Sequence, residues 1–145
     1  MKPRTYVFPF HRSFIALVLG LACLSIHAST AQAATDLLER PARQSQLASK
    51  SMMLTAARAG DRLVAAGERG IVIYSDDHGA TWKQAAVPVS VTLTSLFFVS
   101  RDTGWLAGHD GVILVTTDAG ASWHKQFDGR AANAAVLKDL QARVD

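Results

Sequence analysis

Two stretches of the chain repeat one pattern at a spacing of 41 residues. The segment 66–82, AGERGIVIYSDDHGATW, aligns without a gap to the segment 107–123, AGHDGVILVTTDAGASW. Each stretch consists of short apolar runs separated by Gly- and Asp-rich turns. A repeat of about 40 residues built in this way is typical of a β-propeller blade, which is a four-stranded antiparallel sheet. Because one blade cannot bury its own faces, the repeat predicts sheets that pack on one another.

Eight strand-like runs occur within the region 51–128, four in each repeat. Short runs rich in β-branched and other apolar residues, bounded by Gly and Asp, favour antiparallel strands. The predicted strands are 52–57, 63–66, 71–74 and 82–85 in the first repeat, and 95–99, 105–107, 112–115 and 123–126 in the second. The predicted fold class is therefore all-β, with two four-stranded propeller blades. The pattern does not decide which alternate set points inward; the candidates are Val64, Ile71, Ile73, Leu96, Phe98, Trp105, Val112 and Leu114.

Both repeats end in the same eight-residue plan: hydroxyl, any, Asp, any, Gly, any, hydroxyl, Trp. This Asp-box pattern comprises Ser75, Asp77, Gly79, Thr81 and Trp82 in the first repeat and Thr116, Asp118, Gly120, Ser122 and Trp123 in the second. An Asp side chain can accept hydrogen bonds from its own turn, and Gly supplies a positive φ. A second pair of turn glycines in each repeat is formed by Gly67 and Gly70, and by Gly108 and Gly111.

The Asp-box carboxylates of Asp77 and Asp118 could be read as catalytic groups or as calcium ligands. Turn bracing explains every fixed position of the pattern, whereas calcium needs about six or more converging oxygens. The histidines at 78, 109 and 124 have no metal-site spacing. The sequence therefore predicts structural turns, with no catalytic residue, no cofactor and no metal.

The first 34 residues have the three-part layout of a secretory signal peptide. A basic opening precedes an apolar run at 15–26, and a small-residue cleavage site follows, with cutting predicted after Ala33 or Ala34. The apolar run is shorter than the roughly 20 residues that span a bilayer, which argues against the alternative of a membrane anchor. We expect an exported bacterial protein, periplasmic or extracellular, with no membrane span after cleavage.

Cleavage also changes the charge of the chain. Removing Lys2, Arg4 and Arg12 from the 15 basic residues leaves 12, which equals the 12 acidic residues. A near-neutral mature chain gives no reason to expect a nucleic-acid partner. The single cysteine, Cys23, is also removed, so the fold must be stable without a disulfide.

Two segments flank the repeats. The segment 35–50 is polar and is predicted to be a linker, with a short helix at 37–39. The segment 129–145 carries Val136, Leu137, Leu140 and Val144 at helical spacing. It is predicted to be an amphipathic helix that begins an insertion between blades and covers one exposed blade face.

The repeat core, together with the preceding segment 102–108 (DTGWLAG), resembles the photosystem II stability and assembly factor family of propellers. This resemblance covers about half of the chain. It implies a seven-bladed propeller that serves as an assembly or scaffolding protein, with a protein partner and without catalysis.

Two alternatives stay open. Sialidases and other glycoside hydrolases also carry Asp-boxes, and the chain could be a fragment of such a propeller; it could also be a truncated reading frame without a function of its own. Two blades leave their outer faces uncovered, and repeats are stabilised mainly by their neighbours. We therefore expect the isolated chain to be marginally stable, to self-associate through the open blade faces, or to depend on a partner.

Overall fold

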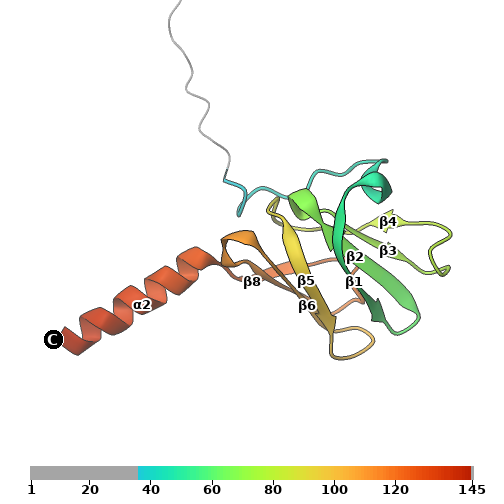
Figure 1. Ribbon diagram of the computed structural model, residues 1–145. Helices are drawn as coiled ribbons and strands as arrows, with labels where there is room; N and C mark the ends of the chain where they lie inside the picture. The colour runs from blue at the N-terminus through green and yellow to red at the C-terminus, as the bar shows by residue number, and fades with distance from the viewer. Residues whose placement is uncertain (1–35, 145) are drawn as a thin grey trace, which may run out of the picture. The chain divides into compact units, whose positions relative to one another are not determined.

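The computed structural model describes residues 36–144, and it consists of two four-stranded antiparallel sheets followed by one helix (Figure 1). The first sheet has the order β1 (Met53–Ala59), β2 (Arg62–Gly67), β3 (Val72–Ser75) and β4 (Lys83–Gln84). The second sheet has the order β5 (Leu93–Phe98), β6 (Gly104–Gly108), β7 (Ile113–Thr116) and β8 (His124–Phe127). The predicted pair of four-stranded antiparallel blades is confirmed. The predicted signal peptide and its cleavage site at Ala33 and Ala34 lie outside the described residues.

The two sheets are built to one plan that differs in a single loop. Short 3₁₀ turns η2 (Glu68–Gly70) and η3 (His109–Gly111) join the second and third strands of the two sheets. The first strands, however, align at a spacing of 40 rather than 41 residues, because Ala57 pairs with Val64 whereas Phe97 pairs with Trp105. The loop between β5 and β6 is one residue longer and absorbs the difference.

The main core lies between the two sheets. Val64, Ala66 and Val72 of the first sheet are fully buried there. From the second sheet, Leu106 and Leu114 are also fully buried in the same core. Strand alternation explains the pattern, since neighbouring residues on a strand point to opposite faces. Of the candidate core residues, Val64, Leu96, Phe98, Val112 and Leu114 contribute to this core, while Ile71 and Ile73 belong to a second cluster.

The second cluster covers the opposite face of the first sheet. Ala65 and Ile73 pack there with Ala48 of the 3₁₀ turn η1 (Ala48–Lys50), and Met53 and Trp82 lie alongside. A small core of this kind needs few residues because Ala65 is short. The first sheet therefore has both of its faces covered by this chain.

The segment before β1 packs on the sheets rather than acting as a free linker. Leu38 and Ala42 are buried in the main core, and the Ala42 N–H donates to the Val87 carbonyl at 2.9 Å. The short helix predicted at 37–39 is wrong, because this segment forms a turn in which the Asp36 carboxylate accepts from the Leu38 N–H at 3.1 Å. Bonding of an Asp side chain to its own backbone competes with helix formation.

The predicted C-terminal helix is confirmed as α2 (Gly129–Val144), but two expectations about it are wrong. None of its residues is buried, and its apolar side chains at 136, 137, 140 and 144 are between 52% and 87% exposed. Therefore α2 covers neither sheet of its own chain. It is also only weakly amphipathic, because alanines occupy much of the side opposite these residues. Within residues 36–144, no helix has the length and apolar character needed to cross a membrane.

Candidate functional site

The first Asp-box turn is closed by the side chains of Asp77 and Ser75. One Asp77 carboxylate oxygen accepts from the Thr81 N–H at 2.8 Å and from the Ser75 hydroxyl at 2.7 Å. Its other oxygen accepts from the Thr81 hydroxyl at 2.5 Å. The Ser75 hydroxyl oxygen in turn accepts from the Gly79 N–H at 2.8 Å. The turn thus holds itself together without any group from elsewhere in the chain.

The second Asp-box turn repeats this network. Asp118 accepts from the Ser122 N–H at 2.9 Å, from the Ser122 hydroxyl at 2.6 Å and from the Thr116 hydroxyl at 2.7 Å. The Thr116 oxygen accepts from the Gly120 N–H at 3.0 Å. Gly120 has a φ of +84° and its equivalent Gly79 a φ of +93°, a region that side chains disfavour. The same chemistry at both positions assigns these carboxylates to the turns.

The hydrogen bonds also determine how these two carboxyl groups titrate. The Thr81 hydroxyl, the Thr81 N–H and the Ser75 hydroxyl lower the pKa of Asp77 to about 2. For Asp118, burial is the largest single influence and raises the pKa, but the bonds from Ser122 and Thr116 outweigh it and the net pKa is lowered. A general acid for glycoside hydrolysis needs a raised pKa, so neither carboxyl is tuned for that role.

This titration predicts a loss of stability in acid. The folded pKa of Asp77, about 2, lies below the value of about 3.9 for an unfolded Asp, so folding favours the ionised form. Its contribution is complete above about pH 4 and disappears as the pH falls through about 2. We expect the urea midpoint to fall over this window, and to fall less steeply in Asp77→Asn. Identical acid profiles for the two proteins would show that the turn does not depend on the carboxylate.

The remaining turn glycines are required by close contacts. Gly67 and Gly108 are extended, and a Cβ added to them would lie 2.0 Å from the Met52 carbonyl oxygen and 2.4 Å from that of Thr92. Gly70 and Gly111 have φ values of +73° and +67°. The predicted repeat glycines therefore serve the backbone path and not a ligand.

Arg62 is a bridging residue that the sequence patterns do not single out. Its guanidinium donates to the Asp76 carboxylate at 2.6 and 3.2 Å and lies 4.4 Å from the centre of the Tyr74 ring. It also donates to the backbone carbonyls of Asp118 and Ala119 at 3.3 and 3.4 Å, and so joins the first sheet to the second Asp-box. Its signal is only a single arginine at a strand start, which no local pattern distinguishes.

The polar hollow around Arg62 offers no spare chemistry. It is lined by Ala59, Asp61, Arg62, Asp76, Arg101, Asp102, Asp118 and Ala119. Arg62 pairs with Asp76, and Arg101 pairs with Asp61 at 3.1 Å. Within the described range 36–144, no three His, Cys, Asp or Glu side chains gather as metal ligands would. The histidines at 78, 109 and 124 are all exposed. We find no arrangement in this hollow that resembles a nucleophile with its base.

The surface with the clearest functional character is apolar. The face of the second sheet that points away from the first sheet carries aromatic and aliphatic side chains, which we call the open face: Phe97, Trp105, Ile113, Val115 and Phe127. Phe97 is 64% exposed, Phe127 40% and Ile113 37%. The Trp105 indole N–H donates to the Gln126 side chain at 2.9 Å, so its polar atom is satisfied on this surface.

The repeat explains why the open face is apolar. At the 41-residue spacing, Trp105, Ile113 and Val115 correspond to Val64, Val72 and Tyr74. In the first repeat those positions pack against the second sheet. The open face is thus the surface on which a further sheet would pack, and in this chain it is left uncovered. Contiguous exposed apolar surface of this kind marks sites of protein contact.

Comparison with known proteins adds a distant likeness. No family model matches the chain, and no curated protein matches it. Among solved structures, that of YCF48 bound to D1 peptide matches with 23% sequence identity and a TM-score of 0.47. The match covers 52% of this chain and 25% of that chain, so it spans about a quarter of the length of YCF48 in that structure. A likeness at this level assigns neither partner nor activity.

Proposed function

We propose that this chain is an exported, non-catalytic protein of the β-propeller type that acts as a scaffold or assembly factor for a protein complex. The observation that carries the proposal is the open face. Its five residues include no Asp, Glu, Lys or Arg, and two of them are phenylalanines that are 64% and 40% exposed. Aromatic side chains without neighbouring charges are typical of the centre of a protein interface.

Two further considerations support a binding role. The Asp-box carboxylates spend their hydrogen bonds inside their own turns and have lowered pKa values, so the acids fixed by the repeat are structural. The sequence resemblance to photosystem II assembly factors implies the same kind of work, and extends the proposal to a role in assembling a membrane complex from its exported side. Export itself rests on the basic, apolar and small-residue layout of residues 1–34.

The proposal is tested by recovering the partner from cells. The full chain carrying an affinity tag is expressed in its host, crosslinked in place and purified, and the proteins joined to it are identified by mass spectrometry. We expect one defined protein species beyond the chain itself. Phe97→Asp should reduce its recovery at least tenfold, because a charge on the open face must be desolvated on binding.

Ala56→Asp is the matched control. Ala56 is also an exposed strand residue, but it pairs with Ala65 on the opposite face of the first sheet. Recovery should therefore be unchanged in this variant. Equal recovery from Phe97→Asp and Ala56→Asp would remove the open face from the proposed function. Release of sugar from a glycoside by the purified chain would instead favour the alternative of a glycoside hydrolase.

A further inference from the structure

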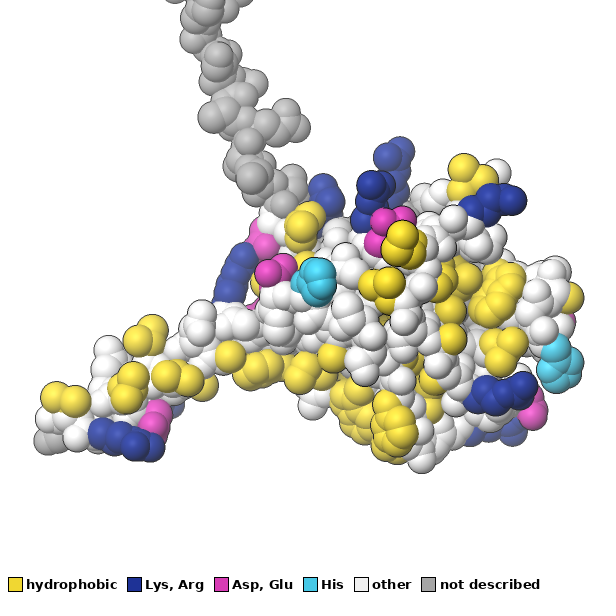
Figure 2. All heavy atoms as spheres, in the orientation of Figure 1, with side chains coloured by type: hydrophobic (Ala, Val, Ile, Leu, Met, Phe, Trp, Pro, Cys, Tyr) yellow, Lys and Arg dark blue, Asp and Glu magenta, His cyan; other side chains and the backbone are white. Residues whose placement is uncertain are grey.

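The chain has a second uncovered apolar surface, which lies on α2. Val136, Leu137, Leu140 and Val144 are spaced so that they share one side of the helix, and all four are more than half exposed. We call this set the α2 stripe. Figure 2 shows hydrophobic side chains in an interrupted band that runs from α2 along the lower edge of the sheets. One chain therefore carries two apolar surfaces, the α2 stripe and the open face, and neither is covered.

We propose that two copies of this chain form a dimer in which the α2 stripe of each copy lies across the open face of the other. The proposal deepens the proposed function, since it rests on the open face being a protein-contact surface and names a second copy as its occupant. A helix on a sheet is a standard way to bury one apolar stripe and one apolar face together.

The start of α2 is fixed, so the helix cannot fold back over its own sheet. Only Asp128 separates β8 from α2, and its carboxylate accepts from the N–H groups of Arg130 and Ala131, both at 3.0 Å. Lys125 holds the other Asp128 oxygen at 3.0 Å and also donates to the Leu38 carbonyl at 3.0 Å. These bonds set the direction in which the helix leaves the sheet.

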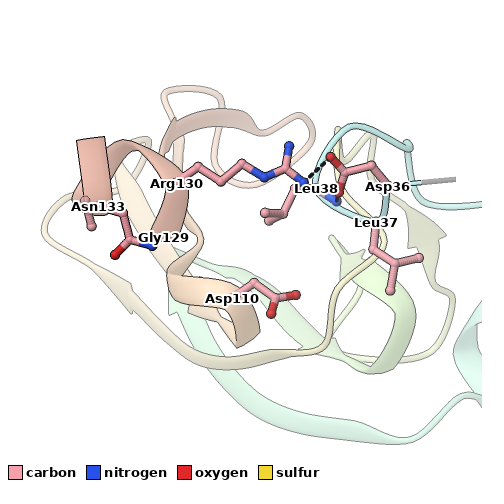
Figure 3. A pocket seen from close by; sticks show the side chains of 8 residues that line it. Asp36, Leu37, Leu38, Asp110, Gly129, Arg130 and Asn133 are labelled. Atoms are coloured by element: carbon pink, nitrogen blue, oxygen red, sulfur yellow. Dashed lines mark hydrogen bonds and ion pairs between the residues drawn. The ribbon is translucent and has the colours of Figure 1, made fainter. Parts of the chain in front are cut away.

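A second anchor acts on the first turn of the helix. Arg130 forms an ion pair with Asp36, and Figure 3 shows its side chain reaching past Leu38 to that carboxylate. A Cβ added to Gly129 would lie 2.8 Å from the Asp110 carbonyl oxygen, so the backbone is also tightly placed against η3. With α2 held at its base by both β8 and the segment before β1, its stripe is available to another copy and not to its own sheet.

The covering of the first sheet limits the assembly to two copies. Its outer face is occupied by η1, with Ala48 packed on Ala65 and Ile73. Each chain therefore offers one open face and one α2 stripe, and exchange of α2 uses both. Such a contact is the same on both copies and closes on itself, whereas two unlike open ends would extend into a filament.

The dimensions and charges of the two surfaces are compatible. The helix has 16 residues and is thus about 24 Å long, and four strands span roughly 15–20 Å. Neither the α2 stripe nor the open face contains a charged residue. The nearby helix charges of Asp139 and Arg143 pair with each other at 2.9 Å. Bringing the surfaces together therefore desolvates apolar side chains without burying an unpaired charge.

The test is the mass of the full purified chain in solution, measured by size-exclusion chromatography with light scattering over a range of concentrations. We expect twice the chain mass. Leu140→Asp and Phe97→Asp should each weaken the dimer at least tenfold and yield monomers. The matched controls Ala142→Asp, on the exposed helix side opposite Leu140, and Ala56→Asp should remain dimeric. All four positions are exposed, so the variants should fold, which circular dichroism verifies.

The exchange of helices is tested by crosslinking between differently tagged copies, in a Cys23→Ser background. Copies with Leu140→Cys are mixed with copies carrying Ile113→Cys and treated with a short bismaleimide. We expect a joined pair with one tag of each kind, and no such pair when Ala142→Cys replaces Leu140→Cys. A monomer at every concentration, or a dimer insensitive to Leu140→Asp, would overturn the proposal.

The outcomes separate this inference from the proposed function. A monomer that still recovers another protein in a Phe97-dependent manner would contradict the dimer and leave the scaffold role standing. A helix-exchanged dimer that recovers no other protein from its cellular compartment would support the dimer and contradict the scaffold role.

Discussion

Replacing Trp123 with alanine is expected to lower the free energy of unfolding by about 3–5 kcal/mol. Trp123 is 3% exposed and its indole N–H donates to the Gly120 carbonyl at 3.2 Å, so the ring closes the second Asp-box from below. It also contacts Phe98 edge to face, with ring centres 6.1 Å apart. The substitution would remove the aromatic pair, leave a cavity in the main core and release one turn carbonyl from its donor.

Trp82 provides the matched comparison, because it occupies the same position of the first Asp-box. It is only partly buried and packs at the edge of the smaller cluster. Trp82→Ala should therefore cost clearly less than Trp123→Ala. Urea unfolding of the two variants, followed by circular dichroism, measures the difference. Equal losses would mean that both tryptophans act through the turn alone and that the main core does not depend on Trp123.

The repeat alone predicted the strands to within a few residues and both Asp-box turns. The reason is that both features are local. Thr81 and Ser122 lie four residues from the Asp side chains they bond, so the sequence pattern contains the whole network. The turn glycines were predictable for the same reason, since backbone path and close contact are set within one repeat.

The direction of the strands' side chains was not predictable. The third strand of the first sheet reads Ile71, Val72, Ile73 and Tyr74, which is apolar on both faces. A strand covered on both sides loses the alternation that would reveal its inner face. The structure assigns Val72 to the main core and Ile73 to the smaller cluster.

Contacts between distant segments account for what the sequence analysis missed. The segment 35–50 was expected to be a linker because it is mostly polar, yet two residues, Leu38 and Ala42, suffice to seat it in the core. The helix was expected to cover a blade because its apolar residues need cover. Its direction is instead set by pairs such as Arg130 with Asp36, which no local pattern contains.

The second large effect concerns two neighbouring residues of β7. Leu114 is fully buried between the sheets, whereas Ile113 is 37% exposed on the open face. Leu114→Ala should lower the free energy of unfolding by about 2–5 kcal/mol, because it leaves a cavity in the main core. Ile113→Ala should cost about 1 kcal/mol or less, since a half-exposed side chain has less apolar surface to lose. Both are compared in the Phe97→Asp background, in which no second copy is expected to cover Ile113.

The difference between these two unfolding energies tests most directly the central claim that the second sheet buries one face against the first sheet and leaves the other open for protein contact. Urea unfolding at low protein concentration should give a loss at least 1 kcal/mol larger for Leu114→Ala than for Ile113→Ala, with the magnitudes expected from burial. Equal losses, or a larger loss for Ile113→Ala, would show that the open face is buried within the single chain and would contradict the account.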